Sequence, residues 1–244
     1  MQGLDTAPDA SALVIAGFVV LPLLVAFAFV LGVAIGGRRM GNPASRRRWL
    51  AWTASAAAVW MLLCWAVAAT GVLRAFDAVP PPLPILLAVI AALGIAIAAS
   101  PIGVRLARLP LAALVGVQVF RFPLELLMHQ AHLDGVMPIQ MSYSGRNLDI
   151  LTGISAGLLA IALARWRVPR WVVGLWNVAG LALLVNVVAV AVVSNPPFRW
   201  FGDDSLALWV TYPPFVWLPA VLVLAAWAGH LVIFRALVRR PVSP

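Results

Sequence analysis

The sequence predicts an all-α membrane protein, with seven transmembrane helices in a single domain that covers residues 1–244. Of its residues, 64% are hydrophobic and only 10% are charged, whereas a soluble domain is nearer half apolar and a quarter charged. The apolar residues form runs of about twenty or more, a length that crosses a hydrocarbon layer of ~30 Å. The arginines concentrate in alternate connections between these runs, as they do in polytopic membrane proteins.

Seven apolar runs define the expected spans. The chain begins with an acidic segment that has no basic residues, and the first run is longer than the apolar part of a signal peptide. We therefore expect the first span to be retained. The expected spans are about 12–36, 49–73, 82–100, 109–131, 148–164, 171–194 and 212–237.

The charges of the connections predict an orientation. Most of the 17 basic residues follow spans one, three, five and seven, and every acid except Glu125 lies on the other side. Cytoplasmic connections carry the excess of basic residues. The amino terminus is therefore expected outside the cell and the carboxyl terminus in the cytoplasm.

Composition also excludes some functions. The net charge of +9 would suit nucleic-acid binding, but its position at membrane boundaries argues against a nucleic-acid partner. The chain has no lysine, so it cannot form the Schiff base that a seven-helix retinal protein needs. The single cysteine, Cys64, has no partner for an intrachain disulfide.

Span four carries polar side chains at regular spacing. Gln118, Arg121, Glu125, His129 and His132 follow one another at steps of three or four residues, so they share one face of a helix. With a rise of about 1.5 Å per residue, Arg121 lies ~18 Å from the cytoplasmic start, Glu125 ~24 Å and His129 ~30 Å. The charged part of this face is therefore expected deep in the bilayer.

This polar face must point into the helix bundle, because a charge at the bilayer centre costs at least ~2.5–3.5 kcal/mol. We expect Arg121 to pair with Glu125, its neighbour one turn on. Pro123 cannot donate a hydrogen bond to the carbonyl of Val119, so a kink is expected here. Two interpretations remain: the pair fixes the register of the helices, or the face lines a cavity that water reaches.

Polar residues of the other spans lie at the same depth and favour the cavity. Asp149 and Thr152 open span five, Asn195 closes span six, and Tyr212 opens span seven. With the polar face of span four, they make the outer half of the bundle polar. The sequence thus predicts a cavity that opens outward, in which Glu125 and His129 relay a proton or Arg121 receives an anionic substrate.

Two further segments have structural interpretations. The connection 195–211 is expected to form a lid or a membrane anchor at the outer surface, with a short helix at 205–209 and with Trp200, Phe201 and Trp209 in the interfacial aromatic belt. Gly153 and Gly157 form a GxxxG pattern that allows close helix packing inside the bundle.

No cofactor is predicted. Glu125, His129 and His132 would be the ligands if the chain bound zinc or copper, and nearby methionines would suit copper. The third histidine, His230, lies ~22 Å from the outer face, so we expect an interfacial histidine near the cytoplasmic boundary rather than a third ligand.

The run FRFPLELLMH, followed by PIQMSYSGRNLDILTG and later by YPPFVWLPAVLV, resembles a family of uncharacterised bacterial multi-pass membrane proteins. The resemblance covers roughly the second half of the chain. It implies the topology and a place in the bacterial inner (plasma) membrane, among membrane lipids, and it implies no activity.

Three functions fit these features. The leading hypothesis is a transporter or permeation protein for a small solute or a proton. The first alternative is a membrane-embedded enzyme, such as a metal-dependent hydrolase, with Glu125 or His129 as general base toward a lipid or an external substrate. The second alternative is a non-catalytic sensor or assembly factor. The sequence leaves the substrate and a homo-oligomeric state open.

Overall fold

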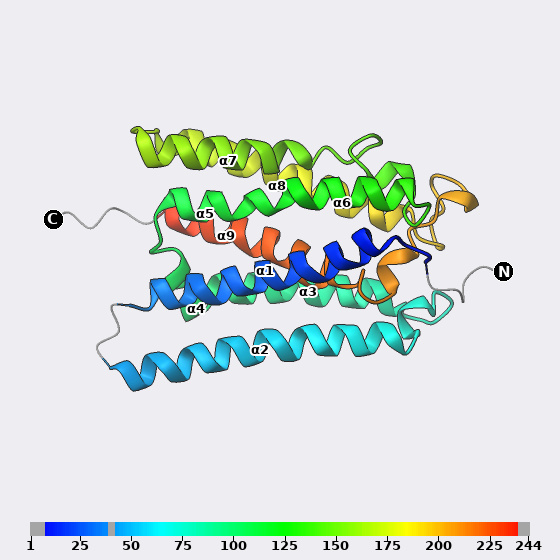
Figure 1. Cartoon of the computed structure of the whole chain (residues 1–244), viewed down its shortest axis with the longest axis horizontal. Coiled ribbons are helices and arrows are strands. Elements are labelled where there is room, and N and C mark those ends of the chain that lie inside the picture. Colours follow the sequence, from blue (N-terminus) through cyan, green and yellow to red (C-terminus); the bar gives the residue numbers. More distant parts are fainter. Residues whose placement is uncertain (1–7, 39–41, 239–244) are drawn as a thin grey trace.

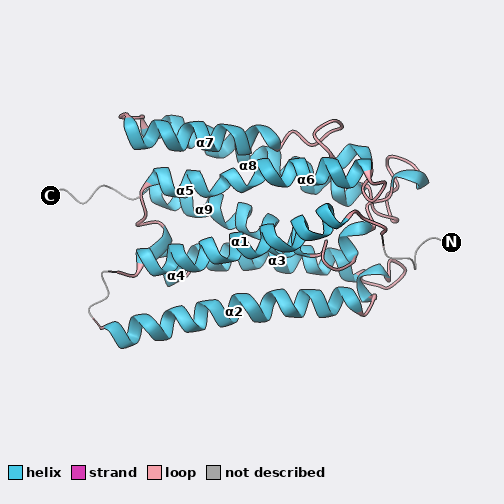
Figure 2. Ribbon diagram, in the orientation of Figure 1, coloured by secondary structure: helices cyan, strands magenta, loops and turns pink. Residues whose placement is uncertain are grey.

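The computed structural model describes residues 8–38 and 42–238, and every regular element in these ranges is a helix (Figure 2). The predicted all-α class is confirmed for this part of the chain. Six described segments are long and apolar enough to cross a membrane. They are α1 (Ala12–Gly36), α2 (Pro43–Ala69), α3 (Pro82–Ala99), Leu111–Leu133, α8 (Arg170–Val193) and Leu218–Val238.

The predicted span at 148–164 corresponds to α7 (Ile150–Arg165), an apolar helix of only 16 residues. It is too short to count among the six. The reason lies in the connection before it, which enters the bundle and buries Asn147 and Asp149 before the helix begins. Backbone that would have continued α7 instead carries polar side chains into the interior.

The long helices lie side by side along the long axis of the molecule, and successive ones run in opposite directions (Figure 1). One end of the bundle holds the start of α1 and the connections 134–149 and 194–217; we call it the loop-rich end. The opposite end holds the short helix α4 (Pro101–Leu106) and the connections that carry most of the arginines. Arg39, Arg239 and Arg240 of that set lie outside the described residues.

Arginines at this opposite end complete helix termini. Arg235 donates to the carbonyl oxygens of Ala98 (2.5 Å) and Ala99 (3.0 Å) at the end of α3. Arg170 donates to those of Ala236 (2.8 Å) and Leu237 (2.7 Å) at the end of α9 (Leu224–Val238). The last carbonyls of a helix lack intrahelical partners and carry partial negative charge, so cationic donors stabilise both ends.

The fourth span is interrupted where its proline predicts a kink. It consists of α5 (Leu111–Val117), a 3-10 turn at Gln118–Phe120 and α6 (Arg121–Leu133). Pro123 has no N–H to donate to the preceding turn, and a tighter turn there accommodates the loss. The interruption ends immediately before Arg121.

The last span is irregular as well. A π-helical segment, Leu218–Val223, precedes α9 (Leu224–Val238). Wide turns of this kind leave a backbone carbonyl without its usual partner. Here the indole of Trp60 on α2 donates to the carbonyl of Ala220 over 2.7 Å.

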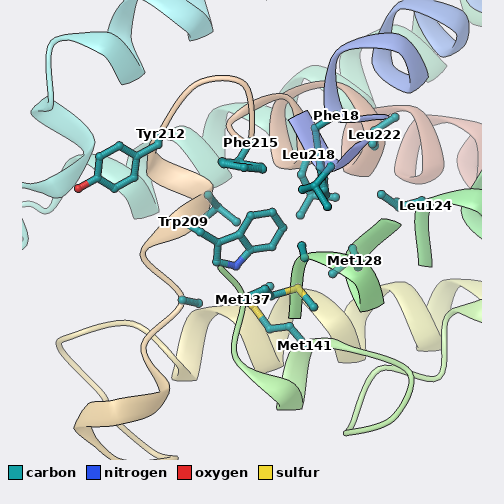
Figure 3. Packing of buried hydrophobic residues seen from close by; sticks show 14 of the residues in the cluster. Phe18, Leu124, Met128, Met137, Met141, Trp209, Tyr212, Phe215, Leu218 and Leu222 are labelled. Carbon is teal, nitrogen blue, oxygen red and sulfur yellow. The ribbon is translucent and has the colours of Figure 1, made fainter. Parts of the chain in front are cut away.

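The loop-rich end is closed by aromatic and sulfur-containing side chains. Trp209 lies between Phe215 and the methionines of the α6–α7 region, and Phe18 of α1 packs edge-on against both rings at 5.2–5.5 Å between centroids (Figure 3). We call this set the aromatic–methionine cluster. Its members are Phe18, Met128, Met137, Met141, Trp209 and Phe215.

The position of Trp209 in this cluster differs from the surface position that the sequence predicts for it. Trp209 is only 2% exposed and belongs to the core, so it is not part of an interfacial belt, whereas Trp200 is 76% exposed. The helix expected at 205–209 is not formed; this connection instead has 3-10 turns at Asp203–Ser205 and Trp209–Thr211. The apolar side chains of this connection are drawn into the bundle because its interior offers them aromatic neighbours.

Small residues let α7 approach the fourth span closely, as the GxxxG pattern predicts. A Cβ added to Gly153 would collide with the backbone of Phe122, whereas one added to Gly157 would meet Val119 at an ordinary 3.6 Å. The contact at Gly153 fixes the height of α7 against α6. It therefore also fixes where Asp149, one turn earlier, meets the fourth span.

Candidate functional site

A buried ion pair forms the centre of the site. The guanidinium of Arg121 donates through Nε to Oδ2 of Asp149 over 2.5 Å and through Nη2 to Oδ1. Both residues are at most 3% exposed. The expected pairing of Arg121 with Glu125 is wrong. The close approach at Gly153 brings Asp149 against Arg121, and a bidentate pair across two helices satisfies the planar guanidinium better than one carboxylate a turn away.

His230 and Asn177 extend the centre to α8 and α9. Nη1 of Arg121 lies 2.8 Å from Nε2 of His230, whose Nδ1 lies 2.8 Å from Oδ1 of Asn177. Because a guanidinium only donates, Nε2 accepts, and Nδ1–H then donates to Asn177. The amide of Asn177 also donates to the backbone carbonyl of His230 over 3.1 Å.

These contacts correct the placement of His230. It has no exposed surface and lies with Arg121 inside the bundle, not at an interface. Gly180 of α8 makes room for it, since a Cβ there would lie 2.8 Å from the ring of His230. The carbonyl of Gly180 also accepts from Nη2 of Arg121 over 3.3 Å. Four helices thus converge on one guanidinium.

Glu125 lies one turn beyond Arg121 and has a different partner. The amide of Asn147 donates to both of its carboxyl oxygens over 2.9 and 2.8 Å and to the carbonyl of Met141 over 3.0 Å. Glu125 is 1% exposed, and no ion pair within the described ranges includes it. It is a buried carboxyl group held by a neutral amide.

Asn147 positions two acids at once. Its Oδ1 accepts from the backbone N–H of Asp149 over 3.0 Å, while its Nδ2 reaches Glu125. Asparagine favours such turns just before helices because its side chain replaces a missing backbone partner. The turn that starts α7 therefore also fixes the distance between the ion pair and Glu125.

A cavity of about 60 Å³ borders Arg121, Glu125 and Asp149. This volume admits a few water molecules. The rest of its wall is mostly apolar, with Leu124, Leu184 and Leu222 among the lining residues, and Met128 and Met141 of the aromatic–methionine cluster are part of it. In place of the outward-opening polar cavity expected from the sequence, a small and mostly apolar chamber lies beside the acids, with Met128 and Met141 of the cluster in its wall.

The polar side chains of span four lie in three different environments. Arg121 and Glu125 border the chamber, whereas Gln118 borders a second cavity. His129 is half-buried near the loop-rich end, where its Nδ1 lies 2.9 Å from Oγ of Ser142 and its ring stacks on Tyr143 at 4.5 Å. Nδ1 of His132 lies 3.1 Å from the carbonyl of Met137.

Of the remaining predicted site residues, one borders the chamber and the others do not. Asn195 lines the chamber and donates to the carbonyl of Ala191 over 2.8 Å. Thr152 is buried beside Gly180 and does not border the chamber. Tyr212 does not border the chamber and points away from Leu124 and Met128 of its wall (Figure 3). The guanidinium of Arg74 lies over its ring, 4.2 Å from the centroid.

The described residues contain no group of three or more histidine, cysteine, aspartate or glutamate side chains placed to hold a metal ion. Glu125, His129 and His132, the ligand set considered from the sequence, are each engaged by a different neighbour. The methionines that would suit copper are packed around Trp209.

The sequence did not reveal which groups Asn147, Asn177 and His230 contact. All three lie on other elements than Arg121, and single polar residues in apolar helices give no pairing signal. A usable signal was the pattern of small and polar residues: Gly153 four residues after Asp149, and Gly180 three residues after Asn177, mark places where helices approach polar side chains.

The fold and the buried network define an apolar, all-helical protein with a charged centre in its interior. A model of the family described as "Domain of unknown function (DUF8737)" matches residues 80–238, more than half of the chain, and the chain belongs to this family. The match includes every residue of the network around Arg121 and Glu125, and it leaves out α1 and α2. No curated protein and no solved structure matches the chain.

Proposed function

We propose that this protein is a multi-pass transporter or permeation protein of the bacterial inner membrane that moves a proton, or a small solute coupled to a proton, through its helix bundle. Glu125 is the group that takes up and releases the proton. The Arg121–Asp149 pair, held by His230 and Asn177, is the fixed charged floor of the path.

One observation carries this proposal. Glu125 is buried, is held by a neutral amide and borders a chamber that admits water, whereas the neighbouring Asp149 is neutralised by Arg121. An ion pair that serves only packing needs one acid for one base. A second, unpaired acid in the membrane interior is costly, and such residues mark proton relays and substrate paths.

The aromatic–methionine cluster supports a gated path. It lies between the chamber and the loop-rich end, and Met128 and Met141 belong to both the cluster and the chamber wall. Methionine side chains are flexible and repack at low cost. We infer that this conformation is closed, and that rearrangement of the cluster and of the connection 194–217 admits water from His129 toward Glu125.

We also propose that the chain crosses the membrane seven times, with α7 as the short fifth span and with the loop-rich end outside. The arginine-rich connections at the opposite end support this orientation. Because α7 lies alongside the fourth span and buries Asp149, it needs to cover only part of the bilayer as a regular helix.

Proton movement by the purified protein in liposomes tests the function. With a pH-sensitive dye inside and a membrane potential imposed by potassium and valinomycin, we expect proton entry above that of empty liposomes. Glu125→Gln should reduce it at least about tenfold, because the amide keeps the shape and one acceptor oxygen for Asn147 but cannot exchange a proton. Asp134→Asn, an acid at the far end of α6, is the matched control.

Two results decide the matter. If Glu125→Gln folds, as judged by circular dichroism and gel filtration, and conducts protons like the wild type, Glu125 is structural and the proposal fails. If the wild type moves protons only when a small solute is added, the solute-coupled form is correct. A membrane-embedded enzyme and a sensor remain predictions from the sequence, without a structural observation that favours them.

A further inference from the structure

A second cavity lies beneath α2. Its volume is about 350 Å³, and it shares no lining residue with the chamber beside Glu125. The π-helical segment separates them, since Leu218 and Leu222 line the chamber while Ala220 and Val221 line the second cavity. We call it the α2 cavity. Its wall comes mainly from α1, α2 and α9, with further residues from α3, α4 and α5.

The α2 cavity is too large and too apolar to be filled by water. Ligand pockets in proteins typically measure about 300–1,000 Å³ and are lined mostly by apolar side chains with a few polar groups. Apolar cavities in protein interiors stay dry, and an empty void loses the packing contacts of its wall. Its lining residues carry no charged side chain, which excludes an ionic ligand.

Two polar side chains border the α2 cavity, and one of them has an unused acceptor. The hydroxyl of Thr53 already donates to the carbonyl of Trp49 over 2.8 Å. Gln118 is 1% exposed, and its Nε2 makes a long contact of 3.4 Å to the carbonyl of Ala226. Its Oε1 is buried and has no hydrogen-bond partner within the described chain. A buried acceptor without a donor costs free energy that a bound hydroxyl would recover.

The wall formed by α2 faces the lipid side of the molecule. Of the six long apolar segments, α2 has the smallest buried share. It is held to the last span by two indole hydrogen bonds, from Trp60 to the carbonyl of Ala220 over 2.7 Å and from Trp217 to the carbonyl of Met61 over 3.0 Å. The cavity extends from this tether along α2 toward Thr53. A ligand dissolved in the hydrocarbon layer can therefore enter the α2 cavity from the side, past α2.

We propose that the α2 cavity binds a neutral single-chain lipid alcohol, with the chain between α1, α2 and α9. Because Oε1 of Gln118 has almost no accessible surface, the amide turns toward the cavity on binding, and the hydroxyl then donates to Oε1. The apolar wall selects the chain, the absence of charge among its lining residues selects a neutral head, and the single unsatisfied acceptor selects one donor. This site is independent of Glu125 and of the proposed proton path.

Photolabelling of the full chain in lipid nanodiscs tests the site. The probe is hexadecan-1-ol with a diazirine in its chain, and labelled residues are located by mass spectrometry. We expect labels on cavity residues such as Phe29, Met61 and Leu93, and competition by unlabelled hexadecan-1-ol about tenfold stronger than by hexadecane, as one buried hydrogen bond supplies.

Matched variants separate the cavity from the lipid-facing surface. Ala57→Phe fills the cavity and should remove the labels, whereas Ala58→Phe, on the exposed side of the same helix, should leave them. Ala228→Phe fills the cavity from α9 and serves if Ala57→Phe does not fold. Gln118→Leu should keep the labels and remove the preference for the alcohol over hexadecane.

The proposal is overturned if labels lie only on lipid-facing positions and persist in Ala57→Phe. It is equally overturned if hexadecane competes with the wild-type protein as well as the alcohol does, since Gln118 would then contribute no recognition.

Discussion

At the Arg121–Asp149 pair, two charges are removed from water and satisfied almost completely by each other and by neighbouring groups. The guanidinium donates to Asp149, His230 and the carbonyl of Gly180, so little of its hydrogen-bonding capacity is unused. A buried pair of this kind adds little net stability, but the loss of one partner leaves the other charge uncompensated. The pair is thus a strong constraint on which helices lie together.

Asp149→Leu should therefore destabilise the protein strongly, by about 3–5 kcal/mol, because it leaves Arg121 buried without its anion. The double variant Arg121→Met with Asp149→Leu should recover most of that loss. Unfolding titrations with sodium dodecyl sulfate in mixed micelles measure both.

A surface pair provides the control for this comparison. Arg199 and Asp203 form an ion pair with side chains 53% and 71% exposed. Asp203→Ala should change the free energy of unfolding by less than about 1 kcal/mol. If Asp149→Leu were as mild as Asp203→Ala, Arg121 would not depend on its buried partner.

Asp134 gives a second prediction at the residue scale. Hydrogen bonds from Ser11, through its side chain and its backbone N–H, and from the amide of Gln130 hold the pKa of this carboxyl below its ordinary value of 3.8. A depressed pKa means that the stabilising contact is present above about pH 4 and is lost as the pH falls through the lower folded value. Hydrogen exchange at Ser11, corrected for the intrinsic rate, should show protection near neutrality that disappears in acid.

In Asp134→Asn the Ser11 amide should be less protected at neutral pH and should lose the acid-dependent step. A step that persists in the variant would assign it to another group.

Spacing alone could predict that Arg121 and Glu125 are buried on one helix face, because charges avoid lipid. It could not predict their partners. The partner of Arg121 lies on the next helix along the chain, and the height at which the two helices meet depends on the absence of a side chain at Gly153. A contact between helices is set by packing, and periodicity within one helix carries no information about it.

Among the elements, interruptions position the polar groups. The 3-10 turn at Gln118–Phe120, the late start of α7 and the π-helical segment Leu218–Val223 all lie next to one of the two cavities. Pro123 and Pro219 accompany two of them, and proline removes a backbone donor. The positions of the prolines were readable from the sequence; the resulting 3-10 and π geometries depend on neighbouring helices that satisfy the freed carbonyls.

Packing of α7 against α6 is the prediction at this scale. Gly153→Ala should destabilise by about 1–3 kcal/mol, because its Cβ would press on the rigid backbone of Phe122. Gly157→Ala should change stability by less than about 1 kcal/mol, because its Cβ has ordinary contact distances. Thermal unfolding in detergent compares the pair. Equal effects would mean that α7 does not depend on close approach at Gly153.

For the whole molecule, the apolar runs predicted the helices within a few residues in α1, α3 and α8, because the length needed to cross a bilayer leaves little freedom. The crossing predicted at 148–164 is not supported by helix length, since α7 has only 16 residues. The connection 194–217 was the least predictable part. Its tryptophans are suited both to a membrane interface and to a protein core. Only the side chains packed around Trp209 show that this residue belongs to the core.

Topology can be tested with single cysteines in a Cys64→Ala background. Ser144→Cys lies in the exposed α6–α7 connection, and Arg167→Cys lies in the exposed α7–α8 connection. If α7 crosses the membrane and the loop-rich end is outside, a membrane-impermeant maleimide added to spheroplasts should label the first and spare the second. Labelling of both or of neither would mean that α7 does not cross, and the reverse pattern would invert the orientation.

The most direct test of the proposed function is the infrared carboxyl band of Glu125 in the protein in liposomes, identified by its absence in Glu125→Gln. Our account predicts that the protonation state read from this band follows the pH on the side of the loop-rich end, and that the band shifts in heavy water. A band that stays unchanged across the pH range in which the protein is folded would contradict it, because Glu125 would then be sealed from water and could carry no proton.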